Sequence, residues 1–163
     1  INGRFTSEQK DLYEIVLTAQ QTAIDSIVPG QNAEGVHMAA VKVLVEGLVD
    51  LGLLIGNVDS LIEQGAYRHL YMHRTGHWLG LDVHDVGAYR LGEYDVNLDQ
   101  GMVLTVEPGL YISDRLEIPE GQPEIHSRWK GIGIRIEDDV FIGQDEIEVL
   151  TSGACKSIHS MEK

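Results

Sequence analysis

Residues 101–112 read GMVLTVEPGLYI, a β-branched and apolar stretch interrupted by Glu107 and Pro108. Apolar and β-branched side chains dominate Met102–Val106, a carboxylate follows at Glu107, and the pair Pro108-Gly109 separates this run from Leu110–Ile112. Short apolar runs bounded by glycine and proline are typical of β-strands. The stretch therefore predicts two consecutive strands, with a glutamate at the end of the first.

Further runs of the same character lie on both sides of this stretch. They are Trp78–Val83, Gly131–Ile142 and Ile147–Leu150, each rich in apolar residues and each bounded by turn-forming residues. The polar segment Ser113–Lys130 contains two prolines and predicts a surface loop. Residues beyond about 75 are thus expected to form a sheet of short strands.

The first 64 residues show helical periodicity instead. Three helices are predicted, over Ser7–Ile27, from Asn32 to Gly52, and from Asn57 or Asp59 to about Gln64. The first begins at a capping-box pattern on Thr6 and is expected to end at Pro29. Helices followed by strands predict an α+β fold in which the helices pack on one face of a mostly antiparallel sheet.

Composition excludes several classes of function. The 163 residues fit one domain, and 12 Lys+Arg against 26 Asp+Glu give a formal charge of −14. This acidity disfavours binding to nucleic acids and to anionic membranes. No apolar run approaches the roughly 20 residues that span a bilayer. Cys155 is the single cysteine, so no internal disulfide forms, and a reducing, cytoplasmic location is predicted.

Three residues are candidates for a metal site. Glu107 and Glu137 each follow an alternating apolar run, and His77 precedes one. A carboxylate at the end of a core strand is costly to bury unless it is paired or bound to a cation. One imidazole with two carboxylates suits Mn²⁺ or Zn²⁺. Because 30 residues separate each from the next, three elements must converge; taken singly, each residue also fits an ordinary strand-edge position.

Three motifs in order carry a family resemblance. They are HRTGHWLGLDVHDVG at 73–87, the stretch at 101–112, and GIGIRIEDD at 131–139. They resemble the signatures of the creatinase/methionine-aminopeptidase ("pita-bread") metallopeptidases, and their wording is more similar to Xaa-Pro aminopeptidases than to prolidases. The resemblance implies a pita-bread fold with helices on a curved sheet. It also implies release of an N-terminal residue that precedes proline, through a metal-bridged hydroxide.

The resemblance implies roles for individual residues. His77, Glu107 and Glu137 match metal ligands, Glu137 as the bridge between two ions and Glu107 as the general acid/base as well. His84 matches a histidine that stabilises the developing oxyanion, and His73 matches a histidine that lines the substrate site. Arg135 and Tyr111 match a pair that supports the ligands. The implied cofactor is two divalent ions, with Mn²⁺ first and Zn²⁺ or Co²⁺ as alternatives.

The sequence departs from the family pattern in one respect. The family's site also contains two aspartates upstream of the segment that begins here at Ile1, and no aspartate of this chain has a matching context. Residues 1–163 are therefore expected to be the C-terminal portion of a catalytic domain, an incomplete pita-bread fold without the N-terminal domain and the first strands. Such a fragment is expected to bind one ion or none, with little activity. Its exposed sheet edge favours a homo-oligomer.

Two alternatives to an Xaa-Pro aminopeptidase stay open. An Xaa-Pro dipeptidase would use the same ligands on a dipeptide instead of on a longer peptide with proline at its second position. A non-catalytic pita-bread module would bind peptides without cleaving them. The intact set of His73, His77, His84, Glu107 and Glu137 favours an enzyme.

Overall fold

The computed structural model describes residues 3–28 and 30–162. Ile1 and the predicted helix end at Pro29 lie outside the described residues. The helices are α1 (Ser7–Asp25), α2 (Ala33–Asp50), α3 (Val58–Glu63) and α4 (Ile158–Met161), with a 3-10 turn at Ser127–Trp129. The strands are β1 (Arg90–Leu91), β2 (Tyr94–Asp95), β3 (Val103–Val106), β4 (Gly109–Ile112), β5 (Ile132–Arg135), β6 (Asp138–Ile142) and β7 (Ile147–Val149).

Side-chain caps begin the three predicted helices. Thr6 Oγ1 accepts a hydrogen bond from the Gln9 amide at 3.2 Å, and Gln9 Oε1 accepts one from the Thr6 amide at 2.9 Å, so the capping box is confirmed. Asn32 caps α2 through the Gly35 amide at 2.8 Å. Asn57 caps α3, which decides between the two starts that the sequence allows. These caps satisfy amides that have no partner inside a helix.

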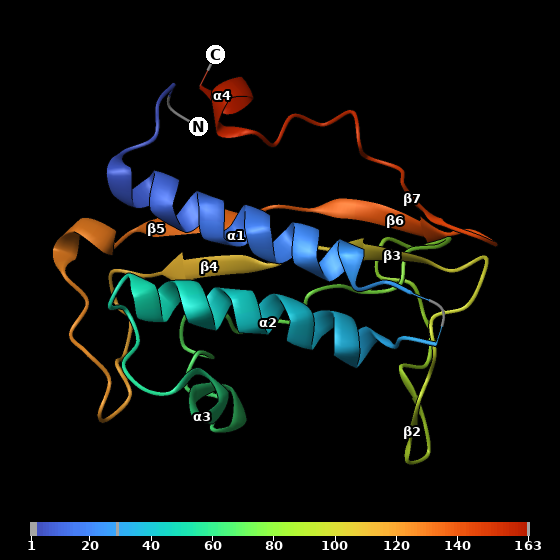
Figure 1. Cartoon of the computed structure of the whole chain (residues 1–163), viewed down its shortest axis with the longest axis horizontal. Coiled ribbons are helices and arrows are strands. Elements are labelled where there is room, and N and C mark those ends of the chain that lie inside the picture. Colours follow the sequence, from blue (N-terminus) through green and yellow to red (C-terminus); the bar gives the residue numbers. More distant parts are fainter. Residues whose placement is uncertain (1–2, 29, 163) are drawn as a thin grey trace.

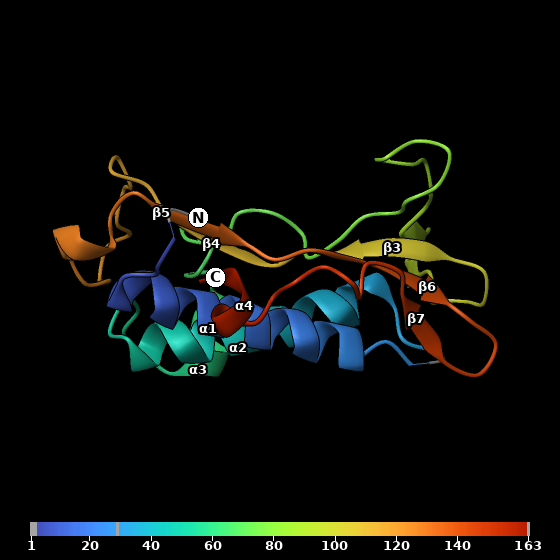
Figure 2. The same cartoon turned by 90° about the horizontal axis from the view of Figure 1, so that it is seen from above.

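The fold has two layers. α1 and α2 run side by side in opposite directions, and the strands of the main ribbon run roughly along the same axis as the helices (Figure 1). Seen from above, both helices cover one side of the strands (Figure 2). The described strands pair antiparallel throughout, which confirms the α+β prediction. Among the described residues, no helix has the length and apolar character that crossing a membrane requires.

A single interrupted ribbon forms the centre of the sheet. β3 pairs with β6 and β4 pairs with β5, and both ladders have the same register. They therefore form one long two-stranded ribbon that is broken at Glu107-Pro108 on one strand and at Ile136-Glu137 on the other. β7 extends it beyond β6. The break is where the two glutamates of the sequence motifs lie.

The predicted strand Trp78–Val83 is wrong. Only Trp78 forms a bridge, with Leu104 of β3, and the chain then leaves the sheet. Leu81 and Val83 are 103% and 70% exposed. Asp85 Oδ2 accepts a hydrogen bond from the Leu81 amide, so side-chain contacts organise this segment as a loop. Alternating apolar residues form a strand only where a neighbouring strand pairs with them, and among the described residues none does beyond Leu79, whose amide donates to Val103 O.

Hydrophobic periodicity in the sequence predicts neither the β1–β2 hairpin nor α4. The β1–β2 hairpin, which extends away from the layers in Figure 1, has four exposed strand residues and turns at Gly92, whose φ is +65°. α4 has no buried residue. Periodicity arises from burial on one face, so elements without a buried residue do not show it.

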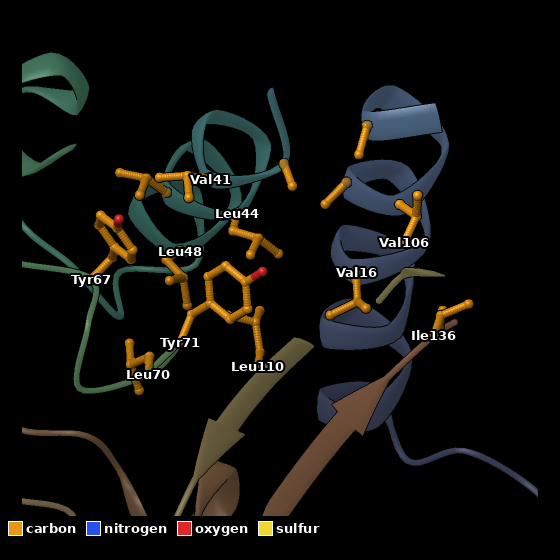
Figure 3. Packing of buried hydrophobic residues seen from close by; sticks show 14 of the residues in the cluster. Val16, Val41, Leu44, Leu48, Tyr67, Leu70, Tyr71, Val106, Leu110 and Ile136 are labelled. Atoms are coloured by element: carbon orange, nitrogen blue, oxygen red, sulfur yellow. The ribbon is translucent and has the colours of Figure 1, made fainter. Parts of the chain in front are cut away.

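Apolar side chains from the helices and the ribbon form one core. Figure 3 shows Leu44 and Leu48 of α2 facing Leu110 of β4, with Tyr71 between them. Val16 of α1 and Val106 of β3 belong to the same buried cluster. The core therefore fixes the ribbon against the helices on both sides of its interruption.

A buried carboxylate ties the C-terminal segment to this core. Asp138 is 2% exposed and accepts hydrogen bonds from Lys156 Nζ at 2.7 Å, Thr151 Oγ1 at 2.6 Å and Gln20 Nε2. Burial raises the pKa of Asp138, but these three hydrogen bonds outweigh it and hold the pKa below its usual value. Asp138 is therefore ionised at neutral pH, with its charge neutralised by Lys156.

Removal of the Lys156 charge tests this buried pair. Lys156→Met is expected to lower the free energy of unfolding by about 3 kcal/mol, because it leaves a buried carboxylate without its countercharge. The control is Lys10→Met, which removes an exposed pair with Glu14 at 3.9 Å and is expected to cost less than about 1 kcal/mol. Urea denaturation at pH 7 measures both; equal costs for the two variants would contradict the assignment.

Candidate metal centre

The ribbon register brings the two glutamates together. Val106 pairs with Asp138 and Gly109 pairs with Arg135, so the same register sets Glu107 opposite Glu137 at the break. Residues directly opposite in an antiparallel pair project from the same face. Like charges at such positions repel each other. This arrangement favours a cation between the two carboxylates.

His77 reaches the same point from the opposite edge of β3. Residues 75–79 run antiparallel beside this strand: the Thr105 amide donates to His77 O at 2.9 Å, and the Leu79 amide donates to Val103 O at 3.0 Å. One ligand atom each of His77, Glu107 and Glu137 lies within 4.8 Å of the others. The predicted convergence of three distant elements is therefore observed, although the role of the three residues as ligands is still a proposal.

Gly76 allows this close approach. A Cβ atom at Gly76 would lie 1.9 Å from the backbone oxygen of Thr105. The contact is with backbone, which cannot rotate away. Glycine at this position is thus required for residues 75–79 to lie against β3 and to present His77.

The hydrogen bonds of His77 identify the atom that faces the glutamates. His77 Nδ1 lies 2.9 Å from Trp78 O, and a carbonyl only accepts, so Nδ1 carries the proton. In the neutral ring, Nε2 then has a free lone pair, and it lies 3.3 Å from Glu107 Oε1. The imidazole lone pair and the two carboxylates converge, and none of these three groups offers a hydrogen-bond donor to the others. One imidazole nitrogen with two carboxylates is a ligand set that suits a divalent cation.

Glu107 is held by residues of its own strand and of the neighbouring strand. It is 7% exposed. Thr105 Oγ1 donates to Glu107 Oε1 at 3.0 Å, and Arg135 Nη1 lies 3.0 Å from Oε2. Thr105 Oγ1 also accepts from the His77 amide at 3.1 Å, so one hydroxyl links two candidate ligands.

His73, Tyr111 and Arg135 form a connected group. His73 Nδ1 lies 2.7 Å from Arg74 O, so it donates and leaves Nε2 as an acceptor. Tyr111 OH donates to His73 Nε2 at 2.8 Å and accepts from Arg135 Nε at 2.7 Å. Arg135 therefore connects this group to Glu107, as the sequence resemblance implies for Arg135 and Tyr111.

A pocket of about 690 Å³ opens beside these residues. Its lining includes His73, His77, His84, Glu107 and Arg135. The ring of His84 packs edge-on against that of His77, with 4.4 Å between centroids. A volume of this size accommodates a short peptide segment next to the candidate metal ligands.

The surroundings of Glu137 raise the pKa of its carboxyl. Partial loss of solvent raises the pKa of the Glu137 carboxyl, and the charge of Glu107 raises it further. No described residue donates a hydrogen bond to this carboxylate to counter the shift. A bound cation would reverse it, because a positive charge favours the ionised form.

Sequence reasoning missed the polar residues behind the site. Thr105, Thr75 and His37 are 2%, 2% and 6% exposed and lie beside the ligands or behind them. His37 belongs to an apolar helical pattern and Thr105 to an apolar run, so each resembles an ordinary packing residue, whereas Thr75 lies inside the 73–87 motif between residues that attract more attention. Only the alternation of Thr105 with Glu107 along one strand could have indicated a shared face.

An imidazole and two carboxylates on an antiparallel ribbon, beside a peptide-sized pocket lined by histidines, define a candidate metallohydrolase class. Comparison with known proteins specifies it further: the model of metallopeptidase family M24 matches residues 1–144. The chain therefore belongs to metallopeptidase family M24. Its two-layer fold is the predicted pita-bread fold, with antiparallel strands.

Similar proteins share nearly all of the chain. The Xaa-Pro aminopeptidase of Haemophilus influenzae is 46% identical over 162 residues, which are 99% of this chain and 36% of that protein. The aminopeptidase PepP of Pseudomonas aeruginosa is 50% identical with a TM-score of 0.90, over 99% of this chain and 35% of that one. Aminopeptidase P of Escherichia coli with the inhibitor Pro-Leu is 46% identical with a TM-score of 0.87, at the same coverages. The chain thus spans about a third of the length of these relatives.

A methyl group at residue 76 tests the close approach of 75–79 to β3. Gly76→Ala is expected to lower the free energy of unfolding by roughly 2 kcal/mol, as overpacking does, because the new Cβ overlaps the Thr105 oxygen. Gly153→Ala, where no atom lies within 4 Å of the added Cβ, is the control and should change it by less than about 0.5 kcal/mol. Thermal unfolding compares the two, and a Gly76→Ala protein as stable as the control would refute the contact.

The protonation of His37 predicts a pH dependence of stability. Burial lowers the pKa of His37 from 6.5 to about 4, and the charge of Arg74 contributes. Because the unfolded chain binds the proton more tightly, this stabilisation is complete above pH 6.5 and is lost as the pH falls toward 4, by on the order of 3 kcal/mol. His37→Asn should remove that loss in urea denaturation between pH 7 and 4. Exposed His159→Asn is the control, and parallel curves for all three proteins would contradict the prediction.

Proposed function

We propose that the chain carries part of the catalytic site of an Xaa-Pro aminopeptidase, which releases the N-terminal residue before a proline. The observation that carries the proposal is the convergence of His77, Glu107 and Glu137 within 4.8 Å, next to a histidine-lined pocket. The 46% identity to an Xaa-Pro aminopeptidase supports the substrate class. Peptides with proline at the second position are the proposed substrates.

The residues of this chain divide the chemistry among them. His77, Glu107 and Glu137 would hold a divalent ion, and such an ion would lower the pKa of a bound water and polarise the scissile carbonyl. Glu107, whose Oε2 lies 3.0 Å from Arg135 Nη1, would accept the proton of the attacking water and return it to the leaving proline nitrogen. His77 would offer Nε2 to the ion, because Nδ1 donates its proton to Trp78 O at 2.9 Å.

Two further histidines act on the substrate. His84, exposed in the pocket wall and packed against His77, donates a hydrogen bond to the oxyanion that develops at the scissile carbonyl. His73 Nε2 already accepts from Tyr111, and this contact orients the imidazole edge that lines the pocket. Tyr111 and Arg135 keep His73 and Glu107 in fixed relative positions.

The cofactor of the complete site is proposed to be two divalent ions, Mn²⁺ first and Zn²⁺ or Co²⁺ as alternatives. His77, Glu107 and Glu137 supply three ligands, whereas a two-ion site needs more carboxylates to neutralise both charges. Residues 1–163 by themselves are proposed to bind one ion or none, with weak or no peptidase activity. Dialysis against Mn²⁺ followed by elemental analysis measures the number of ions bound per chain.

Location and assembly are proposed from exposed side chains. A cytoplasmic location is proposed because one exposed cysteine, Cys155, fits a reducing compartment. A homo-oligomer is proposed because Leu81, Val83 and Val86 leave an apolar loop exposed. Sedimentation of the purified protein tests the second proposal.

Substitution of Glu137 tests the function. In the complete polypeptide that contains this sequence, Glu137→Gln is expected to reduce the release of Xaa from Xaa-Pro-Xaa peptides at least 100-fold and to lower the bound Mn²⁺, because an amide does not supply an anionic ligand. The matched control, Glu148→Gln on exposed β7, should retain both. Mass spectrometry of the products and elemental analysis measure the effects.

The choice of peptides separates the alternatives. Cleavage of Xaa-Pro-Xaa but slow cleavage of Xaa-Pro supports the aminopeptidase, and the reverse pattern supports a dipeptidase. Peptide binding without any cleavage by the Mn²⁺-loaded complete polypeptide supports a non-catalytic module. Full activity of Glu137→Gln would refute the assigned ligand set.

A further inference from the structure

A buried polar group lies directly behind the candidate ligands. It consists of His37 on α2, Tyr71 after α3, and Thr75 at the start of the segment that carries His77. All three side chains are nearly inaccessible to solvent, with 6%, 1% and 2% exposed. They take no part in the proposed chemistry, yet buried polar groups are costly unless their geometry is well satisfied.

The hydrogen bonds of this group have one consistent direction. The Thr75 amide donates to His37 Nδ1 at 3.2 Å, so that nitrogen carries no proton. Thr75 Oγ1, at 2.8 Å, then donates to the same nitrogen. Tyr71 OH, 2.8 Å from Thr75 Oγ1, must therefore donate to it. His37 binds both the backbone and the side chain of Thr75, and Tyr71 completes the coordination of its hydroxyl.

Thr75 is connected to the candidate ligands by backbone. Its carbonyl accepts from the Glu107 amide at 2.6 Å. That amide lies at the break of the ribbon, where β3 ends and Glu107 faces Glu137. Two residues farther along, His77 projects toward Glu107 Oε1 at 3.3 Å. The position of one threonine thus sets the backbone of two candidate ligands.

We propose that Thr75 is a positioning residue, anchored by His37 and Tyr71, that holds Glu107 and His77 at the separation at which they bind one cation. The inference deepens the proposed function and rests on it for its catalytic consequence. The anchor is needed because the ribbon is interrupted at Glu107 and the regular ladder no longer holds the strand there. Neutral His37 suits the role, since burial keeps its pKa near 4 and its Nδ1 an acceptor.

The variants separate the hydrogen bonds from the packing. Thr75→Val removes the hydroxyl at nearly constant volume, and Thr75→Ser retains it. His37→Ala removes the acceptor, whereas His37→Asn offers an amide oxygen near the place of Nδ1. Val41→Ala, in the core on α2 one turn after His37 and without a polar side-chain atom, serves as the matched destabilised control.

Amide hydrogen exchange of Glu107 gives a readout that needs neither metal nor substrate. Thr75→Val and His37→Ala are expected to accelerate exchange at the Glu107 amide on the order of 10-fold relative to Val41→Ala, because the carbonyl that accepts from it is no longer fixed. Thr75→Ser and His37→Asn should retain most of the protection. Equal rates in Thr75→Val and Val41→Ala would overturn the proposal.

Metal binding and kinetics of the complete polypeptide give the second readout. Thr75→Val should weaken Mn²⁺ binding roughly 10-fold and lower kcat with little change in KM, as substitutions that orient metal ligands do. Unchanged Mn²⁺ affinity together with unchanged kcat would overturn the positioning role and leave the aminopeptidase assignment intact. If the unaltered polypeptide neither binds Mn²⁺ nor cleaves peptides, the proposed function fails, while the exchange rates still decide whether Thr75 fixes Glu107.

Discussion

The juxtaposition of two carboxylates across the interrupted ribbon is the constraint on which the structure depends. The common register of both ladders sets Glu107 opposite Glu137, where the two like charges repel each other. One nearby cation, Arg135, contacts Glu107 at 3.0 Å and lowers this cost for one of the two acids. Gly76 and the orientation of His77 then bring the imidazole Nε2 to the same point. This atom is a third acceptor beside the two carboxylates, and not a second cation that would neutralise them.

Much of this could be predicted from the sequence, for identifiable reasons. Thr6, Asn32 and Asn57 mark the helix starts because their side chains cap free amides in the local chain, so no tertiary information is needed. Glu107 and Glu137 are identifiable because a carboxylate at the end of an apolar strand is costly to bury unless it is paired or bound to a cation. The family motifs also led to His73, His77, His84, Tyr111 and Arg135, and the structure groups these residues, although their roles stay proposals.

The remainder depends on long-range pairing that the sequence does not encode locally. Residues 78–83 have the alternation of a strand but leave the sheet after Leu79, because strand formation needs a pairing partner as well as a pattern. His37 lies in an apolar helix and gives no sign that its ring meets Thr75, 38 residues away. The equal spacing of the three candidate ligands was likewise uninformative until the register was known.

The adjacent acids Glu137 and Asp138 have different roles: Asp138 contributes to stability, and Glu137 is a candidate metal ligand. Adjacent side chains on an extended backbone point to opposite faces. Asp138 faces α1 and the C-terminal segment, where Gln20, Thr151 and Lys156 donate to it and lower its pKa. Glu137 faces Glu107, receives no hydrogen bond from the described residues, and has a raised pKa. The first acid has its countercharge within the chain and the second does not, so only the second retains the capacity to bind a cation from solution.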